Sequence, residues 1–209
     1  MIPGSASVRS VVEGRMAQLP AFILCPPPLR AAAVPFRAAI TQRSGTGRTF
    51  STVGFVGLGN MGAPMARNLA SAGHDLLVFD VHDEASTALV ADFGSVTASD
   101  SAGDVARGAD VIVTMLPATQ HVEAVYLGDD GLLASARAGT LFIDSSTISP
   151  HGAQTVTIAA VEAGMEMVDA PVSGGVKKAA LGTLTFMIGG DQGSFARCAG
   201  VICRCAPVH

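Results

Sequence analysis

A glycine-rich turn directly after an apolar run is the feature that most restricts how this chain can fold. Gly57, Gly59 and Gly62 form the pattern G-x-G-x-x-G. The run 53–56 before it is predicted to be a strand, and a helix with one apolar face is predicted from Asn60 to Ala72. Because 24 of the 209 residues are glycine, roughly 0.3 such patterns are expected by chance, and the strand and helix are the context that makes the motif informative.

The turn has the chemistry of a phosphate-binding site. Gly57 permits a tight turn, Gly59 lets a pyrophosphate approach the backbone, and Gly62 lets the helix pack closely on the strand. The start of the helix adds free N–H groups and the positive end of the helix dipole. The predicted cofactor-binding residues of this turn are Gly57, Leu58, Gly59, Asn60, Met61 and Gly62.

Asp80 indicates which dinucleotide the turn accepts. It ends the next predicted strand, Leu76 to Phe79, about twenty residues after the turn. Its carboxylate can accept hydrogen bonds from the adenosine ribose of NAD and would repel the 2′-phosphate of NADP. A flexible turn and a solvated aspartate are the alternative, but that interpretation does not explain a strand, a helix and an acid in register. The sequence therefore predicts NAD as cofactor.

The rest of the body predicts an α/β fold of Rossmann type. From Thr52 onward short apolar runs alternate with helical patterns, which is typical of a doubly wound, mostly parallel sheet. We expect the Rossmann domain to cover 52–195 and a divergent tail to cover 196–209. Further strands are predicted near Val96 and over 111–115, 140–143, 166–168 and 184–188, and further helices over 84–92, 101–107, 119–126, 150–163 and 191–199.

Residues 1–51 differ in composition from the body. They contain six arginines and one acidic residue, and they are rich in Ser, Ala and Pro. This composition resembles a mitochondrial presequence, and Arg48-Thr49-Phe50 before Ser51 resembles the Arg-x-aromatic pattern that the matrix protease cleaves. The mitochondrial matrix is therefore the predicted location. A disordered leader and a true start at Met16 are the alternatives, and the apolar run Ala21 to Cys25 is short for a secretory signal.

Several partners are not expected. The net charge is −4 and the cations of the body are scattered, which does not favour nucleic acid. No stretch reaches the ~20 apolar residues of a membrane span. The histidines have no metal-ligand spacing, and Cys198, Cys203 and Cys205 offer only three thiols without a Cys-x-x-Cys pair, so no metal is predicted.

Four segments in fixed order resemble the β-hydroxyacid dehydrogenases. They are the run Val53 to Leu69, then Met115-Leu116-Pro117, Asp144-Ser145-Ser146-Thr147 and Asp169-Ala170-Pro171-Val172-Ser173-Gly174-Gly175. The resemblance spans Thr52 to about Phe195, the N-terminal domain of that family, and the family's C-terminal all-α domain has no counterpart. The most similar branch oxidises 3-hydroxyisobutyrate with NAD in mitochondrial valine breakdown.

The resemblance assigns further site residues. It places Leu116 and Pro117 beside the nicotinamide ribose and Thr147 near the nicotinamide. His121 stands where many relatives have Asn, and by position it contacts the cofactor. Ser173, Gly174 and Gly175 match the loop that holds a hydroxyacid substrate, although the residues alone also allow an ordinary glycine turn.

No catalytic residue is assigned, because the catalytic lysine of the family lies in a segment without a match here. Lys177 and Lys178 are the only lysines, and they are interpreted as solvated. We therefore expect this chain to bind NAD and a small hydroxyacid with little turnover, as a homo-oligomer or paired with a full-length subunit. A catalytically silent NAD-binding or interaction module, or a related hydroxyacid or tartronate semialdehyde reductase, is the alternative.

Overall fold

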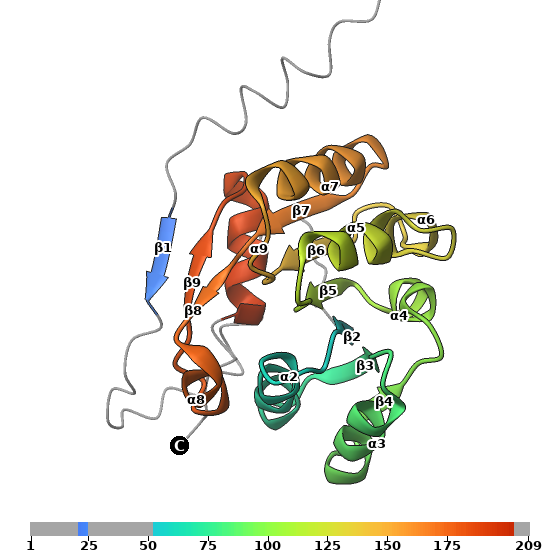
Figure 1. Ribbon diagram of the computed structural model, residues 1–209, viewed down its shortest axis with the longest axis vertical. Helices are drawn as coiled ribbons and strands as arrows, with labels where there is room; N and C mark the ends of the chain where they lie inside the picture. Colours follow the sequence, from blue (N-terminus) through green and yellow to red (C-terminus); the bar gives the residue numbers. More distant parts are fainter. Residues whose placement is uncertain (1–20, 25–51, 203–209) are drawn as a thin grey trace, which may run out of the picture.

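Six parallel strands form the central sheet of the computed structural model, which describes residues 21–24 and 52–202 (Figure 1). Their spatial order is β4-β3-β2-β5-β6-β7, so the chain runs outward in one direction from β2 and then outward in the other direction from β5. This arrangement confirms the predicted doubly wound sheet. The strands are β2 (Thr52–Val56), β3 (Asp75–Phe79), β4 (Val96–Ala98), β5 (Val111–Thr114), β6 (Leu141–Asp144) and β7 (Glu166–Asp169).

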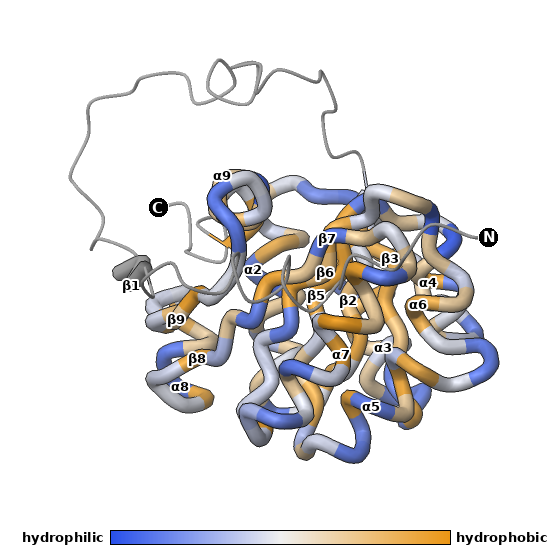
Figure 2. Tube along the Cα trace, turned by 90° about the horizontal axis from the view of Figure 1, so that it is seen from above, coloured by the Kyte–Doolittle hydropathy of each residue, from blue (hydrophilic) through white to orange (hydrophobic). Residues whose placement is uncertain are grey.

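Helices cover both faces of the sheet. One face packs against α2 (Gly62–Ser71), α3 (Asp83–Asp92) and α9 (Gln192–Ile202). The other face packs against α4 (Ala102–Gly108), α5 (Thr119–Leu127), α6 (Leu132–Ser135) and α7 (Pro150–Glu162). Figure 2 shows hydrophobic colours along the central strands and hydrophilic colours on the outer turns. Burial on both faces explains why these strands are continuous apolar runs in the sequence.

Alternation along β6 shows how each strand serves both cores. Leu141 and Ile143 point to the side of α2 and α9, while Phe142 points to the side of α5 and α7. There the Phe142 ring meets Tyr126 edge-on, with ring centroids 5.3 Å apart. All four of these side chains are fully buried. A slip of one residue in this strand would exchange the two cores, so its register is strongly determined.

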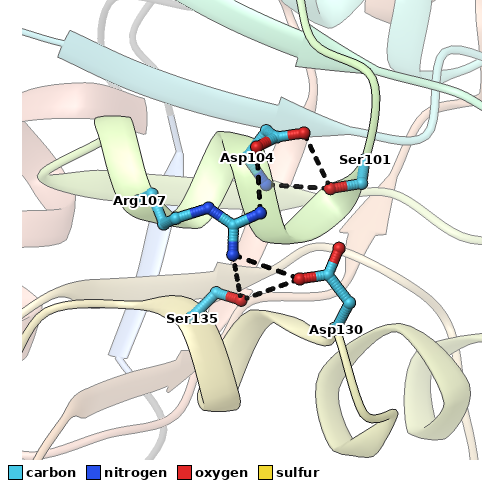
Figure 3. A network of polar contacts seen from close by, with 5 residues as sticks. All are labelled: Ser101, Asp104, Arg107, Asp130 and Ser135. Carbon is cyan, nitrogen blue, oxygen red and sulfur yellow. Dashed lines mark hydrogen bonds and ion pairs between the residues drawn. The ribbon is translucent and has the colours of Figure 1, made fainter.

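Polar side chains fix the start of α4 and its contact with α6. The Ser101 hydroxyl accepts a hydrogen bond from Asp104 N–H at 3.0 Å and caps the helix. The guanidinium of Arg107 reaches Asp104 at 2.9 Å and Asp130 at 3.1 Å, and it also donates to Ser135 (Figure 3). The hydrogen bond from Arg107 lowers the pKa of Asp104, as does the one from Ser101. The network lies at the surface, where such pairs contribute little to stability.

A second, antiparallel sheet lies beside the carboxyl end of β7. Its order is β1 (Ala21–Leu24), β9 (Thr185–Ile188) and β8 (Val172–Ser173), and α8 (Gly175–Ala180) connects β8 to β9. The predicted strand over 184–188 is thus present, but it turns back on β8 and does not extend the parallel sheet. The sequence patterns do not predict β8, α8 or β1.

The last helix is longer than expected. α9 continues three residues beyond the predicted end at Ala199, and Cys198, Val201 and Ile202 are buried in the core on the α2 side. The division of the chain at residue 195 stays a prediction. Cys203, Cys205 and the leader apart from β1 lie outside the described residues. In the described part of the chain no helix is long and apolar enough to cross a membrane.

Candidate cofactor site

The candidate site lies along the carboxyl edge of the parallel sheet. Because every strand of that sheet runs in the same direction, all the loops that follow the strands meet there. Backbone hydrogen bonds continue the ladder into these loops and hold their first residues in place. They run from Gly57 N to Phe79 O (2.9 Å), Met115 N to Val56 O (3.0 Å), Ser145 N to Thr114 O (2.8 Å) and Ala170 N to Asp144 O (2.7 Å).

The three motif glycines meet different surroundings. Gly57 has φ +95°, and a Cβ on it would overlap the carbonyl oxygen of Met115. A Cβ on Gly62 would overlap the carbonyl oxygen of Gly57, so α2 can start this close to β2 only with glycine there. At Gly59, no described atom lies within 4 Å of the added carbon. The protein's own packing therefore requires Gly57 and Gly62, while the space beside Gly59 is open.

Asp80 is bonded to the glycine turn. One carboxylate oxygen accepts a hydrogen bond from Leu58 N–H at 2.5 Å, and the other accepts from His82 N–H at 2.9 Å. Sequence reasoning missed this contact, because it treated the acid only as a ligand of the ribose. Each carboxylate oxygen has a second lone pair, so Asp80 retains acceptor capacity for a diol. Asp80 thus sets the position of the glycine turn and lies at the carboxyl edge of the sheet.

The loops after β5 and β6 are joined to each other. Leu116 N–H donates to the Ser146 hydroxyl at 2.9 Å, which brings together the segments that carry Pro117 and Thr147. The Leu116 side chain lies against Gly57, where an added Cβ would meet its Cδ2 at 3.0 Å. Pro117 and Thr147 are exposed. The residues predicted for the two halves of a dinucleotide therefore lie along one edge.

His121 is placed less directly. It lies in the first turn of α5, the helix that follows Pro117, and its side chain is exposed. Its backbone N–H donates to Ala118 O at 3.0 Å, which belongs to the helix start. The predicted contact of His121 with the cofactor stays a prediction.

The predicted substrate loop leads into α8. Ser173 ends β8 and is exposed, while Gly174 and Gly175 have φ of +140° and +70°, which side chains rarely adopt. Asn68 of α2 donates from Nδ2 to Ala179 O in α8 at 2.8 Å. The helix of the glycine turn therefore holds the helix of this loop. Lys177 and Lys178, on the same helix, are exposed.

Two acids end neighbouring strands at this edge. Asp144 and Asp169 are register partners of β6 and β7. Asp144 is 1% exposed, and burial raises its pKa although hydrogen bonds from Ser146 and Thr114 oppose the rise. Burial raises the pKa of Asp169 to about 6, and the charge of Asp144 adds to the effect. The sequence feature that could have identified these two acids is a polar residue at the end of an otherwise apolar run.

These features define a dinucleotide-binding domain of Rossmann type: a doubly wound parallel sheet, a glycine turn after its first strand and an acid after its second. The family model of the NAD binding domain of 6-phosphogluconate dehydrogenase matches residues 52–208. The chain belongs to this family, and a nicotinamide dinucleotide is the cofactor of such a domain. Among the described residues, no three His, Cys, Asp or Glu side chains gather so that they could hold a metal ion.

Several similar proteins are named as dehydrogenases of L-serine or 3-hydroxyisobutyrate. The chain is 55% identical over 139 residues to the NAD-dependent L-serine dehydrogenase of Pseudomonas aeruginosa, covering 66% of this chain and 46% of that protein. It is 45% identical over 168 residues to human mitochondrial 3-hydroxyisobutyrate dehydrogenase, covering 80% and 48%. The structure of Mycobacterium tuberculosis 3-hydroxyisobutyrate dehydrogenase with L-serine aligns with TM-score 0.70 and 46% identity, covering 75% and 52%. The chain thus spans about half the length of the relatives it matches.

The raised pKa of Asp169 predicts how stability depends on pH. In the folded state this acid holds its proton up to about pH 6, whereas the pKa of an unperturbed aspartate is 3.8. The folded state therefore binds more protons between those values, and the contribution of Asp169 to stability is lost as pH rises through about 6. We expect Asp169→Asn to reduce the fall in unfolding free energy between pH 4 and 7, measured by urea denaturation at several pH values.

Asp75→Asn is the matched control, because this exposed acid starts β3 at the opposite edge of the sheet. This substitution removes one negative charge and leaves Asp144 and Asp169 unchanged. If Asp169→Asn and Asp75→Asn give the same dependence on pH as the unsubstituted chain, the acid at 169 does not titrate as described.

Proposed function

We propose that this chain binds NAD along the carboxyl edge of its sheet and forms the cofactor-binding half of a β-hydroxyacid dehydrogenase. The observation that carries the proposal is the hydrogen bond from Leu58 N–H to Asp80 at 2.5 Å, which holds the acid against the glycine turn. A turn with open space beside Gly59 and an acid fixed next to it have the two features that an ADP-ribose group needs.

The proposed cofactor contacts follow the edge from the glycine turn to β6. The pyrophosphate lies beside Gly59 at the start of α2, where the positive end of the helix dipole favours an anion. Asp80 accepts hydrogen bonds from the adenosine ribose. When bound, NAD supplies the hydride acceptor of the reaction. The residues proposed for the nicotinamide half are Leu116, Pro117, His121 and Thr147.

The proposed substrate is a small carboxylate with a hydroxyl on the β carbon. Exposed Ser173 and the backbone N–H groups at Gly174 and Gly175 offer donors to a carboxylate. 3-Hydroxyisobutyrate is the first candidate, and L-serine is the second because two of the similar proteins are named for it or contain it. Both molecules carry a primary alcohol two bonds from the carboxylate carbon. With the basic leader, the first substrate would place the protein in valine breakdown in the mitochondrial matrix.

Proton transfer is the step for which the two lysines of the sequence are not placed. Oxidation of the alcohol needs a base for the hydroxyl proton while the hydride leaves carbon. The two lysines of the sequence are exposed on α8 and lie outside the family's lysine motif. A missing general base lowers rates by ~10²–10⁴. We therefore propose that the 209-residue polypeptide binds cofactor and turns over substrate slowly, if at all.

The activity proposal is tested with NAD and each of the two substrates, by following NADH formation with the purified polypeptide. Binding of NADH without turnover is the expected result for the chain by itself, and addition of a full-length relative tests whether the chain acts as a partner subunit. Rates similar to those of that full-length relative would contradict the proposal. No binding of either nicotinamide dinucleotide would contradict the dehydrogenase assignment and favour an interaction module.

Gly59→Ala is expected to weaken NADH binding by about tenfold or more without changing the melting temperature. The added methyl meets no described atom of the protein and occupies the space assigned to the pyrophosphate. Binding is measured by calorimetry and stability by thermal melting. Gly94→Ala is the matched control, because an added methyl there is also uncontacted but lies before β4. Unchanged NADH affinity in Gly59→Ala would place the pyrophosphate elsewhere.

Asp80→Asn is expected to reduce the preference for NADH over NADPH by about tenfold, which corresponds to about 1.4 kcal/mol. The amide oxygen can still accept from Leu58 N–H, while the hydrogen bond from His82 N–H and the negative charge that repels a 2′-phosphate are lost. The ratio of the two dissociation constants is the measurement, and Asp75→Asn is the control for loss of one charge. A preference that stays the same would show that another group selects the cofactor.

A further inference from the structure

A relay of buried hydrogen bonds connects α5, β5 and β6 behind the proposed nicotinamide end of the site. The Thr114 hydroxyl donates to Asp144 Oδ1 at 2.8 Å and lies 3.0 Å from the Tyr126 hydroxyl. Since the Thr114 proton is engaged by Asp144, Tyr126 is the donor to Thr114. Thr114 and Tyr126 are completely buried and Asp144 is 1% exposed.

The same carboxylate oxygen fixes the next loop. Asp144 Oδ1 also accepts from Ser146 N–H at 3.1 Å and from the Ser146 hydroxyl at 2.6 Å. The Ser146 hydroxyl in turn accepts from Leu116 N–H. Leu116 packs on Gly57 of the phosphate turn. One buried acid thus determines where the loop after β5 and the loop after β6 lie relative to the turn.

Packing does not explain a polar relay at this position. The other residues of β5 and β6 are apolar and fully or nearly fully buried, so Val or Ile would suit 114 and 144 better if only the core mattered. Burial raises the pKa of both Asp144 and Tyr126, which shows that the charged forms are disfavoured there. Among the described residues Asp144 Oδ2 has no hydrogen-bond partner, which adds to the cost. The relay instead fixes the positions of the loops after β5 and β6, because directional hydrogen bonds restrict loop ends more than apolar contacts do.

We propose that Asp144 is a positioning residue that aligns the nicotinamide half of the site through Thr114, Ser146 and Leu116. The proposal rests on the proposed function, since it assumes that NAD lies along this edge. The adenosine half depends on the glycine turn and Asp80, which are on β2 and β3. Disturbing the relay therefore affects the nicotinamide half selectively.

Thr114→Val is the decisive variant, because valine has the shape of threonine without the hydroxyl. Affinities are measured for NADH and for ADP-ribose, which has the same adenosine half and no nicotinamide. We expect NADH to bind about tenfold more weakly and ADP-ribose to change less than about twofold. The chain has no Trp, so the fluorescence of bound NADH reports the nicotinamide surroundings directly, and its enhancement is expected to fall.

Two further variants separate alignment from structural damage. Thr114→Ser retains the hydroxyl and is expected to restore most of the NADH affinity. Ser146→Ala breaks the link to Leu116 and is expected to reproduce the selective loss. Ser145→Ala is the matched control, because its buried hydroxyl has no partner among the described residues, and both affinities are expected to stay unchanged.

The outcomes distinguish this proposal from the proposed function. If the unsubstituted chain binds neither ligand, the proposed function fails and this inference fails with it. If both ligands bind but Thr114→Val weakens both equally or neither, only the positioning role is overturned. If Thr114→Val and Ser146→Ala both unfold under conditions where Ser145→Ala stays folded, the relay is structural and the proposal is also overturned.

Discussion

The close approach of α2 to β2 is the constraint on which the rest of this structure depends. Gly62 stands where any side chain would overlap the backbone oxygen of Gly57, so the first residue of the helix lies directly against the residue that follows the strand. This places the helix N-terminus, the positive end of the helix dipole, at the carboxyl edge. Asp80 then bonds to Leu58 and closes the turn from the neighbouring strand.

Helix α2 also holds α8, which belongs to the region of the second sheet. Asn68, in the middle of α2, donates to the backbone of α8, and Ala179 of α8 is buried in the core shared with α2. The loop proposed for substrate thus rests on the helix proposed for phosphate. A displacement of α2 would move both regions together, which suits the proposed binding of cofactor and substrate side by side.

The sequence predicted the parallel sheet and the glycine turn because both arise from local patterns. Apolar runs of four or five residues and three spaced glycines can be recognised without knowing which segments lie beside them in the fold. α8 was missed because GVKKAA is short, has no apolar periodicity and begins at two glycines with positive φ. The small antiparallel sheet and the relay depend on contacts across the fold, since Thr114 and Asp144 are 30 residues apart and meet only because β5 and β6 are adjacent.

Two polar networks in this domain differ in burial, and burial determines how tightly each network holds its geometry. The network of Arg107 with Asp104 and Asp130 carries more charges, but it is exposed, so water can replace each contact at small cost (Figure 3). The relay through Asp144 has no such substitute, because its members are removed from water and each lost bond leaves a buried group unsatisfied. Its geometry is therefore held more tightly than that of the surface network. A buried acid held by hydrogen bonds at the end of an apolar strand is for this reason a stronger indication of a site than a surface cluster with more charges.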